Sequence, residues 1–419
     1  MEVISFPGEI LLNILRSLVI PLIMCSVIVG IASLGDLKET GKLGARIMLY
    51  YGATTILAVV LGIIVVTAIQ PGRRGLYNPS VNFNLPANAK SPLESILDVL
   101  SNMFPANLVE ACKKRIQKNP KKKLSFLFLK KKDEKSNILG LIIFAIFLGI
   151  TLTKMGEKAA PMVRFFESLN EAIMNIVNLA LWFAPFGIMS LIISKLGGDG
   201  NFWQKLGQMG MFVVTVVVGL LIHTMLVLPL IFFLFTRKNP YRYMLNLLPA
   251  ILFALGTASS SATLPVTMKN CEENNDCSPK NTRFVLPLGA TVNMNGTALY
   301  EGMAAIFAAQ SLGMQLSIGQ MVVIIITSTL AAVGAAGIPE AGLITMVMVF
   351  TAVNLPLDII GLLFSVDWFL DRLRTVCNIL GDAMGLGIVD HLDKKSSKQV
   401  LVSPSTFDAS DYGTIPNDK

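Results

Sequence analysis

Charged and histidine side chains are scarce in this chain. Of its 419 residues only 15% are charged and two are histidine, whereas 53% are hydrophobic. The mean hydropathy is +0.63. This composition excludes an ordinary soluble domain, and several apolar runs are longer than the roughly 20 residues that cross a bilayer. The sequence therefore predicts a polytopic membrane protein.

Several motifs of soluble enzymes and metal proteins are also missing. The two histidines, His223 and His391, lie far apart, and the five cysteines are scattered. Cys271 and Cys277 share one polar loop without a histidine, so neither a zinc site nor a disulfide framework is indicated. No hydrolase, phosphate-loop or dinucleotide motif stands in a convincing context, and the first residues lack the basic start of a cleavable signal peptide. We expect neither an enzyme nor a bound cofactor.

Positive charge is concentrated in one loop. The formal net charge is +8, but residues 113–135 alone hold eleven Lys and Arg against two acids, which leaves the rest of the chain at −1. A nucleic-acid partner is therefore not indicated. We expect the loop at 113–136 to be mobile and solvated, and the polar tail at 393–419 to be disordered.

A polar stripe lies within the apolar run near the C-terminus. Residues 367–382 read D-W-F-L-D-R-L-R-T-V-C-N-I-L-G-D. On a helix, six of these polar side chains fall within an arc of about 80–100°: Asp367, Asp371, Arg374, Thr375, Asn378 and Asp382. Charges at membrane depth are costly unless they face a cavity or one another. An internal Asp371–Arg374 salt bridge is the alternative, but one arginine cannot satisfy three carboxylates. The stripe predicts binding of a solute and cations.

Three apolar stretches contain residues that interrupt a helix. They are S-S-S-A-T-L-P at 259–265, N-M-N-G at 293–296 and G-A-A-G-I-P-E-A-G at 334–342. Non-helical backbone at membrane depth is tolerated only where it is buried or lines a cavity, where carbonyls can coordinate Na⁺ and helix N-termini can receive anions. Helix packing on small residues explains one such break but fits the combination poorly. We also expect Pro185 to break the long apolar segment at 165–195.

Together these motifs resemble the excitatory amino acid (glutamate/aspartate) transporters of the dicarboxylate/amino acid:cation symporter family. The four motifs S-S-S-A-T-L-P, N-M-x-G-T-A-L-Y-E, G-A-A-G-I-P-x-A-G and D-W-F-L-D-R-L-R-T-x-x-N-x-L-G-D occur in the family's order and spacing. The resemblance covers nearly all of residues 6–392. It implies an all-α homotrimer in the plasma membrane, with a static trimerisation scaffold, two re-entrant helical hairpins, and a mobile transport domain that moves like an elevator.

The resemblance also divides the chain. It implies scaffold at 1–42 and 77–204, transport domain at 43–76 and 205–392, and a cytoplasmic tail at 393–419. Within the second transport segment it implies hairpin 1 at about 243–276, a broken helix at 283–310, hairpin 2 at about 316–352 and a substrate helix at 355–390. The first scaffold helix of the family is expected to be absent from this chain.

The family's substrate residues map onto this sequence. The resemblance implies that Ser260 and Asn378 hold the substrate α-carboxylate, that Asp371 faces the ammonium and that Arg374 pairs with the side-chain carboxylate, for which its planar fork is suited. The full set is Ala258, Ser259, Ser260, Thr297, Ile338, Gly342, Asp371, Arg374, Thr375 and Asn378. Neutral amino acid exchangers of the family lack this arginine. They also lack the glutamate at Glu301, which is the implied proton carrier linked to K⁺ counter-transport.

The resemblance further implies three sodium sites built from oxygen ligands, which suit a hard cation. The first comprises Gly289, Asn293, Asn378 and Asp382. The second comprises backbone oxygens around Thr291, Met294, Ala332, Val333 and Ala335. The third comprises Tyr51, Thr54, Thr55, Asn293 and Asn295.

The expected function is sodium-coupled symport of L-glutamate and L-aspartate, with H⁺ co-transport, K⁺ counter-transport and an associated Cl⁻ conductance. Three alternatives remain. A neutral amino acid exchanger is disfavoured by Arg374 and Glu301. A mainly glutamate-gated anion channel and an inactive truncated form share the same motifs.

Three further departures from the family's pattern stand out. Asn295 occupies the aspartate position of N-M-D-G, which predicts weaker sodium binding. Glu340 lies in the second hairpin tip, where the family has a neutral residue. The basic loop would be extracellular, against the positive-inside tendency. The single sequon, at residues 295–297, lies within a membrane segment, so glycosylation of the basic loop is not expected.

Overall fold

The computed structural model describes residues 2–32, 42–73, 107–108, 115–118, 130–133, 137–197, 202–334 and 341–402. These residues are almost entirely helical, which confirms the predicted all-α class. The helices in chain order are α1 (Glu2–Ala32), α3 (Lys42–Ile69), α7 (Ile138–Met155), η2 (Gly156–Ala159), α8 (Ala160–Gly197), α9 (Phe202–Ile222), the π-helical segment η3 (His223–Val227), α10 (Leu228–Thr236), α11 (Pro240–Leu245), α12 (Leu248–Thr257), α13 (Ser260–Glu273), α14 (Pro279–Val292), α15 (Asn295–Ser311), α16 (Ile318–Gly334), α17 (Ala341–Ala352), η4 (Leu357–Ile359) and α18 (Ile360–Val402).

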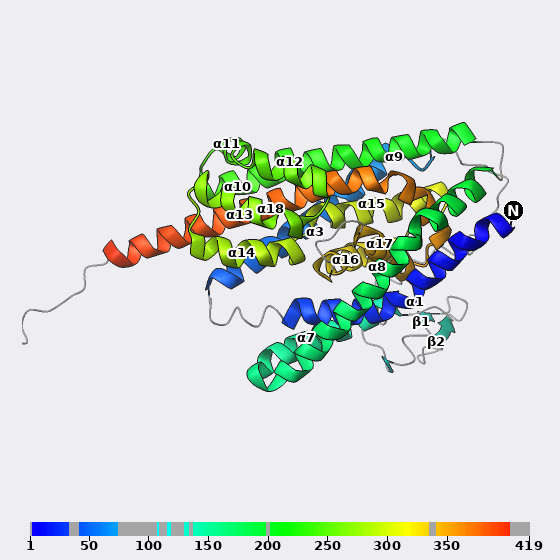
Figure 1. Cartoon of the computed structure of the whole chain (residues 1–419), viewed down its shortest axis with the longest axis horizontal. Helices are drawn as coiled ribbons and strands as arrows, with labels where there is room; N and C mark the ends of the chain where they lie inside the picture. The colour runs from blue at the N-terminus through cyan, green and yellow to red at the C-terminus, as the bar shows by residue number, and fades with distance from the viewer. Residues whose placement is uncertain are drawn as a thin grey trace, which may run out of the picture.

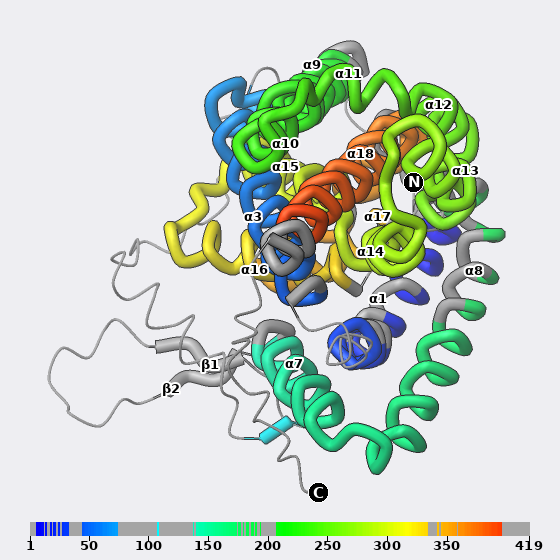
Figure 2. Tube along the Cα trace, turned by 90° about the vertical axis from the view of Figure 1, so that its left-hand side faces the viewer, coloured from blue at the N-terminus to red at the C-terminus, as the bar shows by residue number. Residues whose placement is uncertain are grey.

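The helices form two groups. α1 packs along α8 and α7, and Figure 2 shows these three helices gathered beside a bundle made by α3 and α9 to α18. The two groups meet where α1 contacts α16 and α17. Among the described residues, three segments are long and apolar enough to cross a membrane: Gly44–Ile69, Gly140–Ile173 and Gly207–Thr236. How the groups move relative to each other stays a prediction.

The centre of the bundle is formed by α15 and α18. α18 packs against α15, α14, α12, α10 and α9, and its C-terminal part projects beyond the bundle (Figure 1). Every residue of α15 from Asn295 to Gln310 is buried. A helix that is apolar or small on all its faces is stable only when it is surrounded by protein or lipid. The polar residues of α15, and the stripe of α18 that faces them, are therefore enclosed by the bundle.

The predicted hairpins and helix break are present in the fold. α12 ends at Thr257, Ala258 turns the chain with a φ of +50°, and Ser259 caps α13 by accepting a 3.2 Å hydrogen bond from Ala262 N. Serine is a favoured cap because its hydroxyl accepts from a free N–H of the first turn. The second hairpin is formed by α16 and α17, which pack together. Its connecting residues 335–340, which include Glu340, lie outside the described residues.

Three predictions about regular structure are wrong in part. α8 continues through position 185 without a break, because a membrane helix tolerates an interior proline when the freed carbonyl finds another partner. The basic loop contains an antiparallel strand pair, β1 (Arg115–Lys118) with β2 (Lys130–Asp133). The tail is helical at its start, because α18 runs on to Val402. Residues 403–419 lie outside the described residues.

Candidate functional site

Arg374 lies at the centre of the polar stripe and is fully buried on α18. Its Nη2 is 2.8 Å from Oδ1 of Asp371 and 3.0 Å from Oδ1 of Asp367. The guanidinium carbon is 4.2 Å from the ring centroid of Tyr300 on α15, a cation–π contact. The spacings of three and seven residues place both acids on the face of α18 that carries Arg374. One guanidinium nitrogen thus faces two carboxylates and an aromatic ring.

The other donors of this guanidinium are open. Nε and Nη1 of Arg374 are buried and have no hydrogen-bond partner among the described residues. Gly342, near the start of α17, lies directly against them, since a Cβ at position 342 would be 2.8 Å from Nη1. Buried donors without acceptors are costly, particularly on a charged group. The second hairpin therefore approaches a cation two of whose nitrogens lack an acceptor among the described residues.

The helix break at 293–294 is joined to α18 next to this arginine. Oδ1 of Asn378 accepts a 2.8 Å hydrogen bond from Gly296 N, and its Nδ2 donates to Oγ1 of Thr297 at 3.4 Å. Thr375 donates to the backbone carbonyl of Asp371. The first turn of α15 and the middle of α18 are thereby held in register. The predicted substrate residues of these two helices lie together.

The first hairpin also reaches α18, one turn further along. Ala258, Ser259 and Ser260 at its tip are buried. Both α12 and α13 pack on α18, and Ile379 forms a small cluster with alanines of α12. The predicted residue of the opposite hairpin tip, Ile338, lies outside the described residues. The structure therefore packs the first hairpin on α18, the predicted substrate helix, and leaves the contribution of the other tip open.

The first predicted cation set is assembled around Asp382. Its Oδ1 accepts a 2.8 Å hydrogen bond from Nδ2 of Asn293. Gly289 lies so close that a Cβ there would be 2.6 Å from both Oδ1 of Asp382 and Oη of Tyr51. Asn378 precedes Asp382 by one helical turn on the same face. A buried carboxylate is thus surrounded by amide, hydroxyl and backbone groups at the point where the helix is broken.

The third predicted set lies between α3 and the helix break. Oγ1 of Thr54 is 3.4 Å from Oδ1 of Asn293, and Oγ1 of Thr55 is 2.8 Å from Oδ1 of Asn295. Both threonines also donate to backbone carbonyls one turn back, and a hydroxyl has one hydrogen to give. Nδ2 of Asn295 is buried without an acceptor among the described residues. An oxygen in its place would suit a cation better.

The second predicted set is less complete. Met294 and Ala332 belong to one packed cluster. Thr291 is exposed and its hydroxyl donates to Leu288 O within its own helix, whereas the carbonyl of Val333 faces Gly30 on α1. Ala335 lies outside the described residues. Within the described part of the chain, no three Cys, His, Asp or Glu side chains gather into a metal site. A cation bound at the predicted sets would be held by neutral oxygens and single carboxylates.

Glu301 is fully buried on α15, and neither of its carboxylate oxygens makes a well-formed hydrogen bond among the described residues. The hydroxyl of Thr345 is a potential donor to this carboxylate, and the charge of Arg374 also acts on it. Sequence reasoning placed Asp367 on the stripe without a role and did not select Tyr300. Both contact Arg374 directly. Two features of the sequence could have identified them: Asp367 lies two helical turns before Arg374, and Tyr300 immediately precedes Glu301.

A buried stripe of charge between two helical hairpins, inside a bundle with membrane-length apolar helices, defines a membrane transporter for a charged solute. The chain belongs to the sodium:dicarboxylate symporter family, which matches residues 1–392. This confirms the predicted family, shows that the protein is a transporter and not an enzyme, and makes it a multi-pass protein of the plasma membrane.

Similar curated proteins include three excitatory amino acid transporters. Excitatory amino acid transporter 1 of Ambystoma tigrinum is 44% identical over an alignment of 430 positions that covers 93% of this chain and 77% of the relative. Excitatory amino acid transporter 3 of Mus musculus is 43% identical over an alignment of 449 positions that covers 98% of this chain and 85% of the relative. An excitatory amino acid transporter of Caenorhabditis elegans is 45% identical over 412 residues, covering 93% and 82%.

Proposed function

We propose that this protein carries L-glutamate and L-aspartate across the plasma membrane by sodium-coupled symport, with H⁺ entering and K⁺ returning the empty carrier. The observation that carries the substrate class is the open guanidinium of Arg374, whose Nε and Nη1 have no acceptor among the described residues. A carboxylate is the acceptor that a planar guanidinium binds best. The names of the relatives support the same class of substrate.

The remaining substrate contacts follow from the neighbours of Arg374. The ammonium group requires an anion, and Asp371 lies one turn from the guanidinium with its carboxylate on the same face. The α-carboxylate requires donors, which Asn378 supplies through Nδ2 and the first hairpin supplies at Ser260. The long 3.4 Å bond from Asn378 to Thr297 leaves that amide hydrogen available for a better acceptor. The ammonium group of the substrate would thereby face Asp371, and its side-chain carboxylate would face Arg374 on the same helix.

The charge balance of the interior supports cation coupling. Among the described residues, the buried stripe and α15 hold four carboxylates, Glu301, Asp367, Asp371 and Asp382, against the single guanidinium of Arg374. The sum is −3 when all are ionised, and an acidic amino acid adds one further negative charge. A net charge of this size is unstable at membrane depth. Co-transported Na⁺ at the sets around Asp382 and Thr55, together with a proton, would neutralise it.

Glu301 is the proposed site of proton and potassium coupling. An ionised carboxylate that is buried without hydrogen-bond donors is strongly disfavoured, so the side chain is stable when protonated or beside a cation. A proton on Glu301 and a K⁺ bound beside it would each neutralise the same carboxylate, which also faces Arg374 and Thr345. H⁺ and K⁺ would therefore exclude each other at this position, as counter-transport requires.

The proposed movement uses the two groups of helices. α1, α7 and α8 would form the scaffold of a homotrimer, and the bundle holding Arg374 would move against it as an elevator, with a Cl⁻ pathway along the boundary. The boundary along which it would move is formed by α1 against α16 and α17 and by α8 against α18. α8 exposes large apolar side chains, including Leu179 and Trp182, that suit lipid or a partner protomer.

The test is uptake of radiolabelled L-aspartate into proteoliposomes with Na⁺ outside and K⁺ inside. Uptake that disappears when choline replaces Na⁺, and weakens when internal K⁺ is replaced, supports the proposal. Sodium-independent uptake, or uptake of neutral amino acids at the rate of aspartate, would overturn it. An Arg372→Cys variant is a matched control, because Arg372 lies on the same helix but stacks on the exposed Trp368.

A further inference from the structure

Two cysteines meet at the far end of the first hairpin. α13 ends at Glu273, and the chain then turns through Asp276, which has a φ of +53°. This left-handed residue brings the backbone back over the last turn of the helix, so that Cys277 N donates a 3.0 Å hydrogen bond to Cys271 O. Both cysteines are free and buried. The turn places them side by side although five residues separate them.

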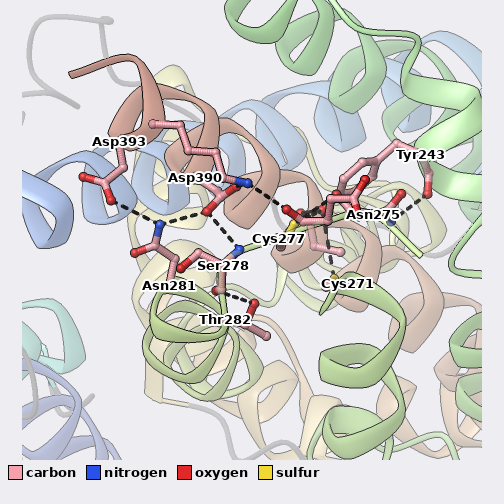
Figure 3. A network of polar contacts seen from close by, with 12 residues as sticks. Tyr243, Cys271, Asn275, Cys277, Ser278, Asn281, Thr282, Asp390 and Asp393 are labelled. Carbon is pink, nitrogen blue, oxygen red and sulfur yellow. Dashed lines mark hydrogen bonds and ion pairs between the residues drawn. The ribbon is translucent and has the colours of Figure 1, made fainter. Parts of the chain in front are cut away.

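The two thiols share one tyrosine hydroxyl. Oη of Tyr243 is 3.5 Å from Sγ of Cys277 and 4.0 Å from Sγ of Cys271, and it donates a 2.8 Å hydrogen bond to Ala383 O on α18 (Figure 3). The same hydroxyl can donate instead to Sγ of Cys271, and in its contact with Sγ of Cys277 either atom can be the donor. The two thiols also hydrogen-bond to each other, so their sulfurs are neighbours. A disulfide requires a further approach, to about 2.05 Å, by a change of side-chain rotamer.

The environments of the two thiols differ. Cys277 lines a cavity of about 430 Å³ whose wall also contains Lys238, Arg242 and Lys394, whereas Cys271 is not part of that wall. A hydrogen bond from Cys271 lowers the pKa of the Cys277 thiol against the opposing effect of burial, and Tyr243 acts in the same direction. Asp390 disfavours and Lys394 favours the thiolate, and these two residues are paired at 2.7 Å.

We propose that Cys277 and Cys271 form a peroxide-sensitive dithiol site that is converted reversibly to an intramolecular disulfide. The Cys277 thiolate attacks one oxygen of a hydroperoxide, so that an S–O bond forms, the O–O bond breaks and an alcohol or water leaves. The Cys271 sulfur then attacks the resulting sulfenic acid, the S–S bond forms and water leaves. Two thiols thereby supply the two electrons that reduce one hydroperoxide.

The location of the site agrees with reversible oxidation. The same end of the bundle carries Arg237, Lys238, Arg242, Lys394 and Lys395, a clustering of basic residues that is typical of the cytoplasmic side of membrane proteins. The cytoplasm keeps thiols reduced, so a disulfide there forms transiently and is removed by thiol exchange. The cavity would admit a small peroxide to Cys277, and Cys271 behind it would resolve the sulfenic acid.

Trypsin makes the test direct, because cleavage after Lys269 and Lys280 releases both cysteines in one peptide, residues 270–280. The purified full-length chain in lipid nanodiscs is treated with hydrogen peroxide, alkylated with iodoacetamide and digested with trypsin. The mass of the peptide 270–280 is then measured by mass spectrometry. The reduced peptide gains two alkyl groups. The expected product gains none and is two hydrogens lighter, and dithiothreitol before alkylation restores the doubly alkylated form. This readout is independent of transport, so its failure and that of the transport proposal are distinguishable.

Variants separate the two sulfur roles. With Cys271→Ser, the sulfenic acid should persist on Cys277 and be captured by dimedone. With Cys277→Ser, dimedone should label Cys271 at least about tenfold less than it labels Cys277 in the Cys271→Ser variant. Cys377, buried in the middle of α18, is the internal control. The proposal is overturned if the peptide stays doubly alkylated at peroxide concentrations that oxidise Cys377, or if dimedone labels the two serine variants equally.

Discussion

Replacing Arg374 by cysteine should change the substrate class of this transporter. The guanidinium is fully buried and has open donors where we place the side-chain carboxylate of the substrate. Removing one partner of a buried, hydrogen-bonded charge pair costs about 2–5 kcal/mol. At 1.4 kcal/mol per factor of ten, the half-saturation concentration for L-aspartate should rise about 30-fold to a few thousand-fold. Small neutral amino acids should then become substrates, because a thiol leaves space and no charge.

The same substitution leaves two buried acids without their cation. Asp367 and Asp371 both contact Nη2 of Arg374 and are nearly inaccessible to solvent. Breaking a buried ion pair in this way costs about 3–5 kcal/mol of stability, so a lower folded yield is expected for the single variant. The double variant Arg374→Cys with Asp367→Asn removes one of the uncompensated charges. It should recover folded protein and neutral amino acid uptake, but not aspartate affinity.

The assay is competition between unlabelled L-serine and radiolabelled L-aspartate, with the yield of folded protein followed by gel filtration. Arg372→Cys should behave as the unchanged protein, since this arginine lies on the exposed side of α18 over Trp368. The reasoning is refuted if Arg374→Cys keeps its aspartate half-saturation within about threefold of the unchanged protein. It is also refuted if Arg372→Cys loses aspartate to the same extent, because the effect would then not depend on the buried stripe.

Three further substitutions test separate parts of the site. Asn295→Asp should lower the Na⁺ half-saturation concentration about tenfold, because an oxygen replaces a buried N–H group that has no acceptor; an unchanged Na⁺ titration would contradict this. Gly342→Ala should weaken aspartate uptake at least about tenfold, because the added Cβ would lie 2.8 Å from Nη1 of Arg374. The control Gly256→Ala should have no effect, because a Cβ at position 256 would meet no atom within 4 Å. Glu301→Gln should abolish K⁺-driven net uptake and its pH dependence while Na⁺-dependent exchange continues; persistent K⁺ dependence in a flux assay would exclude Glu301 as the coupling residue.

Local sequence patterns predicted the parts of the site that depend on short-range rules. The three- and four-residue spacing of the stripe sufficed to place Asp371 and Arg374 on one face, because helical periodicity determines it. The serine-rich and N-M-N-G segments predicted interruptions because small residues and amides favour caps and turns over helix interiors. The break predicted at Pro185 is wrong because it depends on tertiary contacts and not on a short-range rule. A proline alone does not state whether its freed carbonyl finds a new partner, so a continuous helix could not be foreseen.

Contacts between distant segments could not be read in the same way. The stacking of Tyr300 on Arg374 depends on how α15 lies across α18, which no local pattern encodes. The meeting of Cys271 and Cys277 depends on one left-handed residue, Asp276, and on the position of Tyr243 some thirty residues earlier. The sequence indicated no disulfide framework. In the fold, Tyr243 is held by its hydrogen bond to Ala383 O on α18, and its hydroxyl contacts both thiols.

The hydrogens of Arg374 Nη2 constrain how an acidic substrate enters. Nη2 donates a 2.8 Å hydrogen bond to Asp371, whereas the 3.0 Å contact with Asp367 has no hydrogen-bond geometry. A carboxylate that binds the Nη1–Nη2 edge in the bidentate manner must therefore displace Asp367, the weaker partner, and can leave Asp371 for the ammonium group. Asp367 is then buried beside one new carboxylate, and a proton or a cation would be needed to neutralise it. We therefore expect substrate binding and cation binding to be linked through the shared guanidinium as well as through the proposed sodium ligands.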